Sequence, residues 1–202
     1  GLLDMLRRHR VELVAIGNGT GCHETERLVS ETITENGLPV RYAMVNEAGV
    51  SAYAASEAAC KEFPNLDATL RGTVSIGRRL QDPLAEFVKV DPRSIGVGLY
   101  QHDVDADRLK RHLERVTACC VNHVGVHVNL AEATLLRYVA GLDDNLAHNI
   151  MVHRHEHGPL RTLSELRNVP GISEHVFRQA AGFLRIAGGD DPLDATPIHP
   201  DD

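Results

Sequence analysis

The chain has 202 residues, of which 43% are hydrophobic and 24% are charged, and this composition is typical of a folded globular protein. A net charge of −7 argues against a protein that binds nucleic acid over its whole surface, and no apolar run approaches the ~20 residues of a membrane helix. The four cysteines show no CxxC spacing, which favours a reducing cytoplasmic setting, or a nuclear one in a eukaryote.

The first half of the chain alternates between helices and short apolar strands. Residues 1–9 indicate an amphipathic helix rather than a signal peptide, so we expect that further sequence precedes Gly1. The alternation predicts an α/β fold with a parallel sheet, and because two strands are too few for a stable sheet, we expect more strands upstream. The expected elements are strands over 11–16 and 40–45 and helices over 22–35, 49–63 and 68–88, the last bent near Asp82 and Pro83.

The second half of the chain has a different pattern. Residues 91–98 are rich in turn formers and indicate a linker, and beyond Asp105 no convincing strand appears. This half is therefore predicted to be all-α, followed by an extended tail over 188–202. The expected helices cover 106–124, 130–139, 144–157, 162–167 and 174–186.

Charge is distributed unevenly along the chain. Residues 106–186 carry ten Lys and Arg against eight Asp and Glu, whereas residues 187–202 carry five Asp and no basic residue. We therefore expect any phosphate-binding surface to lie within residues 106–186, and to bind in a weak and salt-sensitive way.

Internal repetition in this basic segment is the strongest functional signal. It follows the helix-hairpin-helix pattern, in which spaced apolar residues flank a Gly-apolar-Gly turn. The first copy comprises Leu136, Val139, Gly141, Leu142, Ala147 and Ile150, with Asp143 in place of the second glycine. The second copy, thirty residues later, comprises Leu166, Val169, Gly171, Ile172 and Ala180, with Ser173 in place of the second glycine and Phe177 in place of a small residue.

Such a turn exposes backbone amides at the start of the second helix, where these donors and the helix dipole bind a phosphate oxygen. Glycine permits positive φ and close approach, while Asp143 and Ser173 can cap the helices that follow. Asp143 also places a negative charge where a phosphate would lie. A helical hairpin used only for packing is the alternative. The candidate contacts are Gly141, Leu142, Asp143, Asn145, Gly171, Ile172, Ser173, His175 and Arg178, with Arg137, Arg154 and Arg185 as further sources of charge.

Three other patterns are weaker. The turn Gly17–Gly21 follows a strand, but it lacks the Lys-Ser/Thr of a P-loop and does not match GxGxxG, so an ordinary turn is favoured. Glu47 follows the second strand and is a weak candidate for Mg²⁺ catalysis, but Asp67 and Asp82 are not evident partners for it. The alternating histidines of 153–157 cannot share one helix face, which favours a solvated helix end over a metal site.

Several longer stretches resemble the Tex family of transcription accessory proteins. They are VNEAGVSAY at 45–53, LRGTVSIGRRLQDPLAE at 70–86, IGVGLYQHDV at 95–104, AAGFLRI at 180–186 and DPLDA at 191–195. The resemblance implies the later part of a YqgF-type domain of RNase H-like fold over 1–104 and a tandem helix-hairpin-helix domain over 105–187. It also implies that residues 188–202 are a linker to an OB-type RNA-binding domain, and that a helical region lies at the other end of such proteins. Family members are regarded as nucleic-acid-binding factors in transcription rather than as proven nucleases.

We therefore predict α/β followed by all-α architecture, and a non-catalytic fragment that contacts the backbone of RNA, DNA or both without reading sequence. The transcription machinery is a candidate partner. No cofactor, metal, membrane or small-molecule substrate is expected. Two alternatives stay open, namely a Mg²⁺-dependent resolvase-like nuclease that uses Glu47, and an interaction scaffold whose hairpins do not bind nucleic acid.

Overall fold

The computed structural model describes residues 1–201, and the chain divides between Val97 and Gly98 into two compact units. Among the helices of residues 1–201, none combines the length and the apolar character that a membrane span requires. The predicted domain division after residue 104 stays a prediction, and the compact units divide seven residues earlier.

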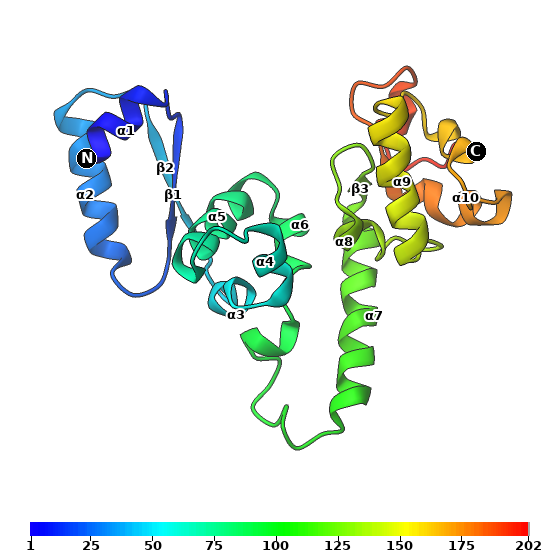
Figure 1. Cartoon of the computed structure of the whole chain (residues 1–202), viewed down its shortest axis with the longest axis horizontal. Coiled ribbons are helices and arrows are strands. Elements are labelled where there is room, and N and C mark those ends of the chain that lie inside the picture. Colours follow the sequence, from blue (N-terminus) through cyan, green and yellow to red (C-terminus); the bar gives the residue numbers. More distant parts are fainter. Residues whose placement is uncertain (202) are drawn as a thin grey trace. The chain divides into compact units, whose positions relative to one another are not determined.

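The first unit is built on two parallel strands, β1 (Leu13–Gly17) and β2 (Arg41–Val45), which pair in register from Leu13 with Arg41 to Gly17 with Val45. Figure 1 shows α1 and α2 on one side of the strand pair and α3 to α6 on the other. The helices are α1 (Leu2–Arg8), α2 (Cys22–Glu35), α3 (Val50–Ala54), α4 (Glu57–Glu62), α5 (Ala68–Gln81) and α6 (Pro83–Phe87), followed by the 3-10 turn η1 (Pro92–Ile95).

Capping side chains divide two of the helices that the sequence predicts as continuous. The expected helix 49–63 is split into α3 and α4, because the hydroxyl of Ser56 accepts a hydrogen bond from the amide of Ala59 and starts a new helix. The expected helix 68–88 is broken rather than bent. Asp82 caps α6 through the amide of Ala85, and Pro83, which lacks an N–H, occupies the first turn of α6.

Helix α5 packs tightly against α3 and carries buried polar groups. A Cβ at Gly72 would lie 3.0 Å from Cγ1 of Val50, so a larger residue would push the two helices apart. Ser75 and Glu86 are both buried, and the Ser75 hydroxyl donates to the Glu86 carboxylate at 2.9 Å. Lys89 pairs with Glu86 at 3.0 Å, which neutralises the buried carboxylate.

The second unit consists mainly of helices and short 3-10 turns. They are α7 (Ala106–Val124), α8 (Ala133–Leu136), α9 (Asp144–His157), η2 (Leu163–Asn168), α10 (Glu174–Ala180), η3 (Ala181–Phe183) and η4 (Pro192–Ala195). Its core is formed by apolar side chains that are no more than 2% exposed, among them Val121, Val126, Val128, Leu136, Ile150, Leu163, Leu166, Phe177 and Leu184. α7 and α9 have the predicted bounds, which confirms those two predictions.

Three predictions for this unit are wrong. The unit contains two short parallel strands, β3 (Val126–His127) and β4 (Leu184–Arg185), although no strand was expected. This pairing draws the chain out of helix after Ala180, so the helix expected over 174–186 is shortened to α10. The helix expected over 130–139 is reduced to the four residues of α8, because the chain turns into the first hairpin.

The tail is a fourth correction, because it is folded rather than extended. The carboxylate of Asp194 is buried and accepts a hydrogen bond from the amide of Leu163 at 2.7 Å. The amide of Ile186 donates to the Asp194 carbonyl at 2.8 Å, and Asp191 caps η4. These contacts fix residues 186–195 on the second unit.

Candidate nucleic-acid interface

Two hairpins of similar geometry lie in the second unit. The first hairpin comprises α8, the turn 137–143 and α9, and the second comprises η2, the turn 169–173 and α10. The glycine in each turn has positive φ, +86° at Gly141 and +87° at Gly171, which confirms the predicted reason for glycine at both positions. In each turn, the amide after the glycine is already bonded: Leu142 donates to the Val139 carbonyl at 3.0 Å, and Ile172 donates to the Val169 carbonyl at 3.1 Å.

The residues that replace the second glycine act as helix caps. The carboxylate of Asp143 accepts from the amide of Leu146 at 2.8 Å, and the hydroxyl of Ser173 accepts from the amide of Val176 at 3.3 Å. Both predictions of capping are confirmed. In each helix the cap satisfies the amide at the third position and leaves the first two positions without an intrahelical partner.

The amides that remain free are those that a phosphate would need. Within residues 1–201, the amides of Asp144 and Asn145 in α9, and of Glu174 and His175 in α10, have no hydrogen-bond acceptor. All four residues are exposed. Each hairpin therefore presents two adjacent backbone donors at the positive end of a helix dipole.

The two hairpin glycines pack against each other's helices. A Cβ at Gly141 would lie 2.8 Å from Cβ of Gln179 in the second hairpin, and a Cβ at Gly171 would lie 3.0 Å from Cδ2 of Leu146 in the first. Asn149 of α9 also donates to the Pro170 carbonyl at 2.9 Å. Glycine is thus required at both turns by protein packing as well as by positive φ.

Phe177 fills the position where the repeat pattern has a small residue. Its side chain is fully buried, and the guanidinium of Arg167 lies over its ring at 3.5 Å from the centroid. The equivalent position in the first hairpin is Ala147, which is also fully buried. The core therefore accommodates the larger Phe177 side chain at this position.

Arginines beside the hairpins have different roles. Arg154 donates to the carbonyl of Ala131 at 2.9 Å and Arg185 to that of Gly182 at 2.8 Å, and burial lowers the pKa of both guanidinium groups. The prediction that these two supply charge to a ligand is therefore wrong, because they hold backbone carbonyls of their own unit. Arg137 and Arg178 lie beside the free amides and are exposed.

Each of these two exposed arginines pairs with the acid that opens the second helix of its hairpin. Arg137 Nη1 lies 3.5 Å from Asp144 Oδ1, and a hydrogen bond with the Tyr138 hydroxyl raises its pKa. Arg178 Nε lies 3.2 Å from Glu174 Oε1. A carboxylate thus already neutralises each cation at the helix start.

Sequence reasoning missed the asparagines that brace the turns. Asn122 of α7 donates from Nδ2 to the Tyr138 carbonyl at 2.9 Å, and its Oδ1 accepts from the amide of Ala140 at 2.9 Å. Asn129 makes the same two-way contact with the backbone of Leu160. For Asn122, a polar residue on the inward face of α7 was the available signal, but its partners are distant in sequence.

The Gly-rich turn of the first unit is covered by a carboxylate. A Cβ at Gly17 would lie 2.7 Å from Oε2 of Glu47, and one at Gly19 would overlap the same carboxylate. The amide of Glu47 also donates to Asn18 Oδ1 at 3.1 Å. Glu47 therefore occupies the place where a phosphate would approach this turn.

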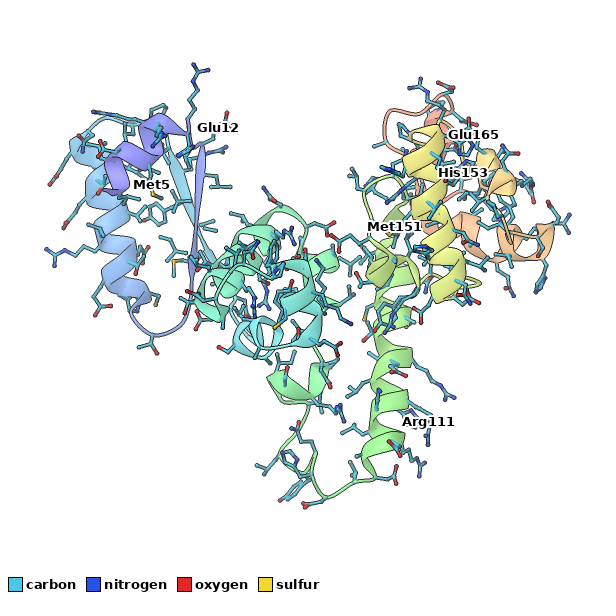
Figure 2. The ribbon with its side chains drawn as sticks, viewed as in Figure 1. Met5, Glu12, Arg111, Met151, His153 and Glu165 are labelled. Carbon is cyan, nitrogen blue, oxygen red and sulfur yellow. The ribbon has the colours of Figure 1, made fainter. Side chains whose placement is uncertain are left out.

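The other weak candidates are also located by the structure. Asp67 and Asp82 cap α5 and α6, so they do not converge with Glu47. His153 and His157 stack at 4.4 Å between ring centroids and, with Glu156 and Glu165, line a groove of about 590 Å³ between α9 and η2 (Figure 2). Within residues 1–201, no three His, Cys, Asp or Glu residues are grouped so that they could hold a metal ion.

Comparison with known proteins agrees with the division of the chain into two units. Residues 1–81 match the family described as Tex protein YqgF-like domain, and residues 121–185 match the helix-hairpin-helix motif. The first unit is thus YqgF-like, of RNase H-like fold, and a helix-hairpin-helix unit follows it, which confirms the predicted fold class.

Several curated relatives are similar over nearly the whole chain. Protein tex of Bordetella pertussis is 55% identical over 99% of the chain, and transcriptional accessory protein Tex of Neisseria gonorrhoeae is 52% identical over 98%. S1 RNA-binding domain-containing protein 1 of Homo sapiens is 47% identical over 90%. The chain spans only 25%, 26% and 19% of these relatives, respectively.

Proposed function

Since this chain belongs to the Tex family, we propose that it binds the sugar-phosphate backbone of RNA or DNA through the two hairpins, without reading base sequence. The observation that carries the proposal is the pair of free, exposed amides at the start of both α9 and α10. Backbone amides recognise phosphate oxygens and carry no base information, so the contact is independent of sequence. The candidate contacts are Gly141, Leu142, Asp143, Asn145, Gly171, Ile172, Ser173, His175 and Arg178, although the amides of Leu142 and Ile172 serve the turns themselves.

The names of the relatives support this proposal. One is called a transcriptional accessory protein and another an S1 RNA-binding domain-containing protein. We extend nucleic-acid binding to this chain on the basis of its own hairpins, and we propose action together with the transcription machinery as the wider setting.

We also propose that the YqgF-like unit does not hydrolyse nucleic acid. Glu47 lies on the Gly-rich turn, while Asp67 and Asp82 are committed to helix caps, and within residues 1–201 no three His, Cys, Asp or Glu residues are grouped so that they could hold a metal ion. Incubation of the chain with labelled RNA and DNA in the presence of Mg²⁺ or Mn²⁺ should leave both intact. Cleavage that is abolished by Glu47→Gln would contradict this part of the proposal.

The binding test removes individual amides and leaves the fold intact. Asp144 and Glu174 occupy the first position of α9 and α10, where proline is well tolerated, and the residue before each is already extended. Asp144→Pro with Glu174→Pro therefore deletes one free donor per hairpin. Asp144→Ala with Glu174→Ala is the matched control, because it removes the same carboxylates and keeps the amides.

Fluorescence anisotropy with labelled single- and double-stranded oligonucleotides measures the outcome. We expect the unaltered chain to bind at about 50 mM salt and to weaken steeply by about 200 mM. The proline pair should bind at least tenfold more weakly than the alanine pair, since each charge-assisted hydrogen bond contributes about 1.5–3 kcal/mol and the proline pair loses one in each hairpin. Absence of binding at low salt, or equal binding by the two pairs, would refute the proposal. Bulky residues at Gly141 or Gly171 are unsuitable for this test, because they collide with Gln179 or Leu146.

A further inference from the structure

The N-terminal half of α7 carries a group of cations that the hairpins do not explain. Arg108, Lys110, Arg111 and Arg115 are all exposed, and within residues 1–201 their side chains make no ion pair. The chain as a whole carries a net charge of −7, so a run of unpaired cations along one helix stands apart from the rest of the molecule. Figure 2 shows Arg111 on this part of α7, standing off the ribbon.

Two of these arginines line a groove of about 480 Å³ between α7 and the first hairpin. Arg111 and Arg115 are one helical turn apart and therefore share a face of α7. Ala118 lies one turn further on, and its small side chain leaves room in the groove. The opposite wall is formed by Arg137, Tyr138, Asp143 and Asp144.

The groove is held in place by the brace already described. Asn122 of α7 bonds to the backbone of Tyr138 and Ala140 at 2.9 Å, so the helix and the turn are fixed relative to each other. The groove is thus formed within one unit, beside the free amides of the first hairpin.

The free donors in the groove favour an anion. The carboxylate of Asp143 is used as a cap, and that of Asp144 faces Arg137 at 3.5 Å. The three arginines and three acids of the lining sum to zero in formal charge, but Arg111 and Arg115 make no ion pair within residues 1–201, so their guanidinium donors are available to a ligand. An arginine presents a planar set of donors that matches phosphate oxygens, which distinguishes this wall from a general basic surface.

We propose that this groove receives a second backbone phosphate of the nucleic acid held by the first hairpin, with Arg111 and Arg115 as its donors. The inference rests on the proposed function, and it makes the first hairpin the stronger of the two. Beside the second hairpin the arginines are instead paired with acids, because Glu174 pairs with both Arg167 and Arg178, and Asp201 lies 3.2 Å from Arg167.

The test compares two double variants of α7 in the whole chain. Arg111→Ala with Arg115→Ala removes two charges from the groove, and Arg108→Ala with Lys110→Ala removes two charges from the same helix outside it. All four side chains are exposed and make no ion pair within residues 1–201, so both variants should melt at the temperature of the unaltered chain.

Anisotropy titrations measure the affinity of each variant for oligonucleotides over a series of salt concentrations. We expect the groove variant to bind about tenfold more weakly at low salt. Its plot of log affinity against log salt should be shallower by about 0.7 for single strands or 0.9 for duplex, the value for one lost phosphate contact. The control variant should change the affinity by much less and keep the slope.

Two results would overturn the inference. If the groove variant matches its control, the charges act only at long range. If the groove variant binds oligonucleotides as well as the unaltered chain, the groove does not contact nucleic acid and is available to another anion, such as an acidic protein segment. Either result leaves the proposed function intact as long as the proline pair at Asp144 and Glu174 still loses binding.

Discussion

Asp194 anchors the tail of the second unit, and its replacement tests whether residues 186–195 belong to the fold. Its carboxylate is 5% exposed and accepts from the amide of Leu163, a residue with no exposed surface, at 2.7 Å. Asp194→Ala leaves this amide in the interior without an acceptor, and a hydrogen bond to a charged group contributes about 1.5–3 kcal/mol. We expect the free energy of unfolding of this unit to fall by about 2 kcal/mol, or Tm to fall by roughly 10 °C.

Urea unfolding followed by far-ultraviolet circular dichroism measures this change. Asp194→Asn keeps an oxygen acceptor and should recover much of the loss. Asp190→Ala is the matched control, because Asp190 pairs with Arg161 at the surface, where an ion pair contributes little. An unchanged urea midpoint for Asp194→Ala would refute the reasoning, since it would mean that the tail leaves Leu163 accessible to water.

Two further predictions also concern the loss of side-chain hydrogen bonds. Asn122→Ala removes both hydrogen bonds that brace the first hairpin, so we expect a loss of about 2 kcal/mol in urea unfolding, together with weaker binding of oligonucleotides. Glu62 is partly buried, which raises its pKa, but hydrogen bonds from Arg78 and Tyr53 outweigh this and lower it overall. Its contribution to stability is therefore complete above the unfolded-state pKa of about 4.3 and is lost as pH falls through the lower folded-state pKa. Glu62→Gln should make the first unit less sensitive to acid, as measured by its unfolding free energy between about pH 5 and 3; an equal acid sensitivity would count against this assignment.

Local sequence was sufficient for several elements whose controlling interaction is itself local. Helix α2 begins after Gly21 and ends before Asn36, and α9 begins at the cap Asp143 and ends before Gly158, all of which are signals within a few residues of the boundary. The parallel pairing of β1 with β2 was also predicted, because a helix between two apolar runs favours that connection.

Several of the failures depend on partners that are distant in sequence. Leu184 and Arg185 leave the helical pattern because they pair with Val126 and His127, and nothing near residue 184 indicates this. The tail is rich in aspartate and has the composition of a disordered segment, yet Asp194 finds a buried amide donor. Arg154 looks like a surface cation in the sequence, but it binds the carbonyls of Val128 and Ala131, which precede α8.

The loss of the second glycine in each hairpin has a different meaning in the structure from the one that the sequence suggested. Asp143 was expected to place a negative charge where a phosphate would lie. Asp143 and Ser173 instead direct their oxygens to the third amide of the helix, so the first two amides remain free. The acid that follows the cap in each hairpin, Asp144 or Glu174, pairs with a neighbouring arginine. A phosphate that reaches the amides would meet this arginine as well, and it would replace the carboxylate as the partner of the cation. The carboxylate stays on the same helix turn and keeps its charge, so a bound phosphate adds one negative charge there, which the two amides and the positive end of the helix dipole stabilise.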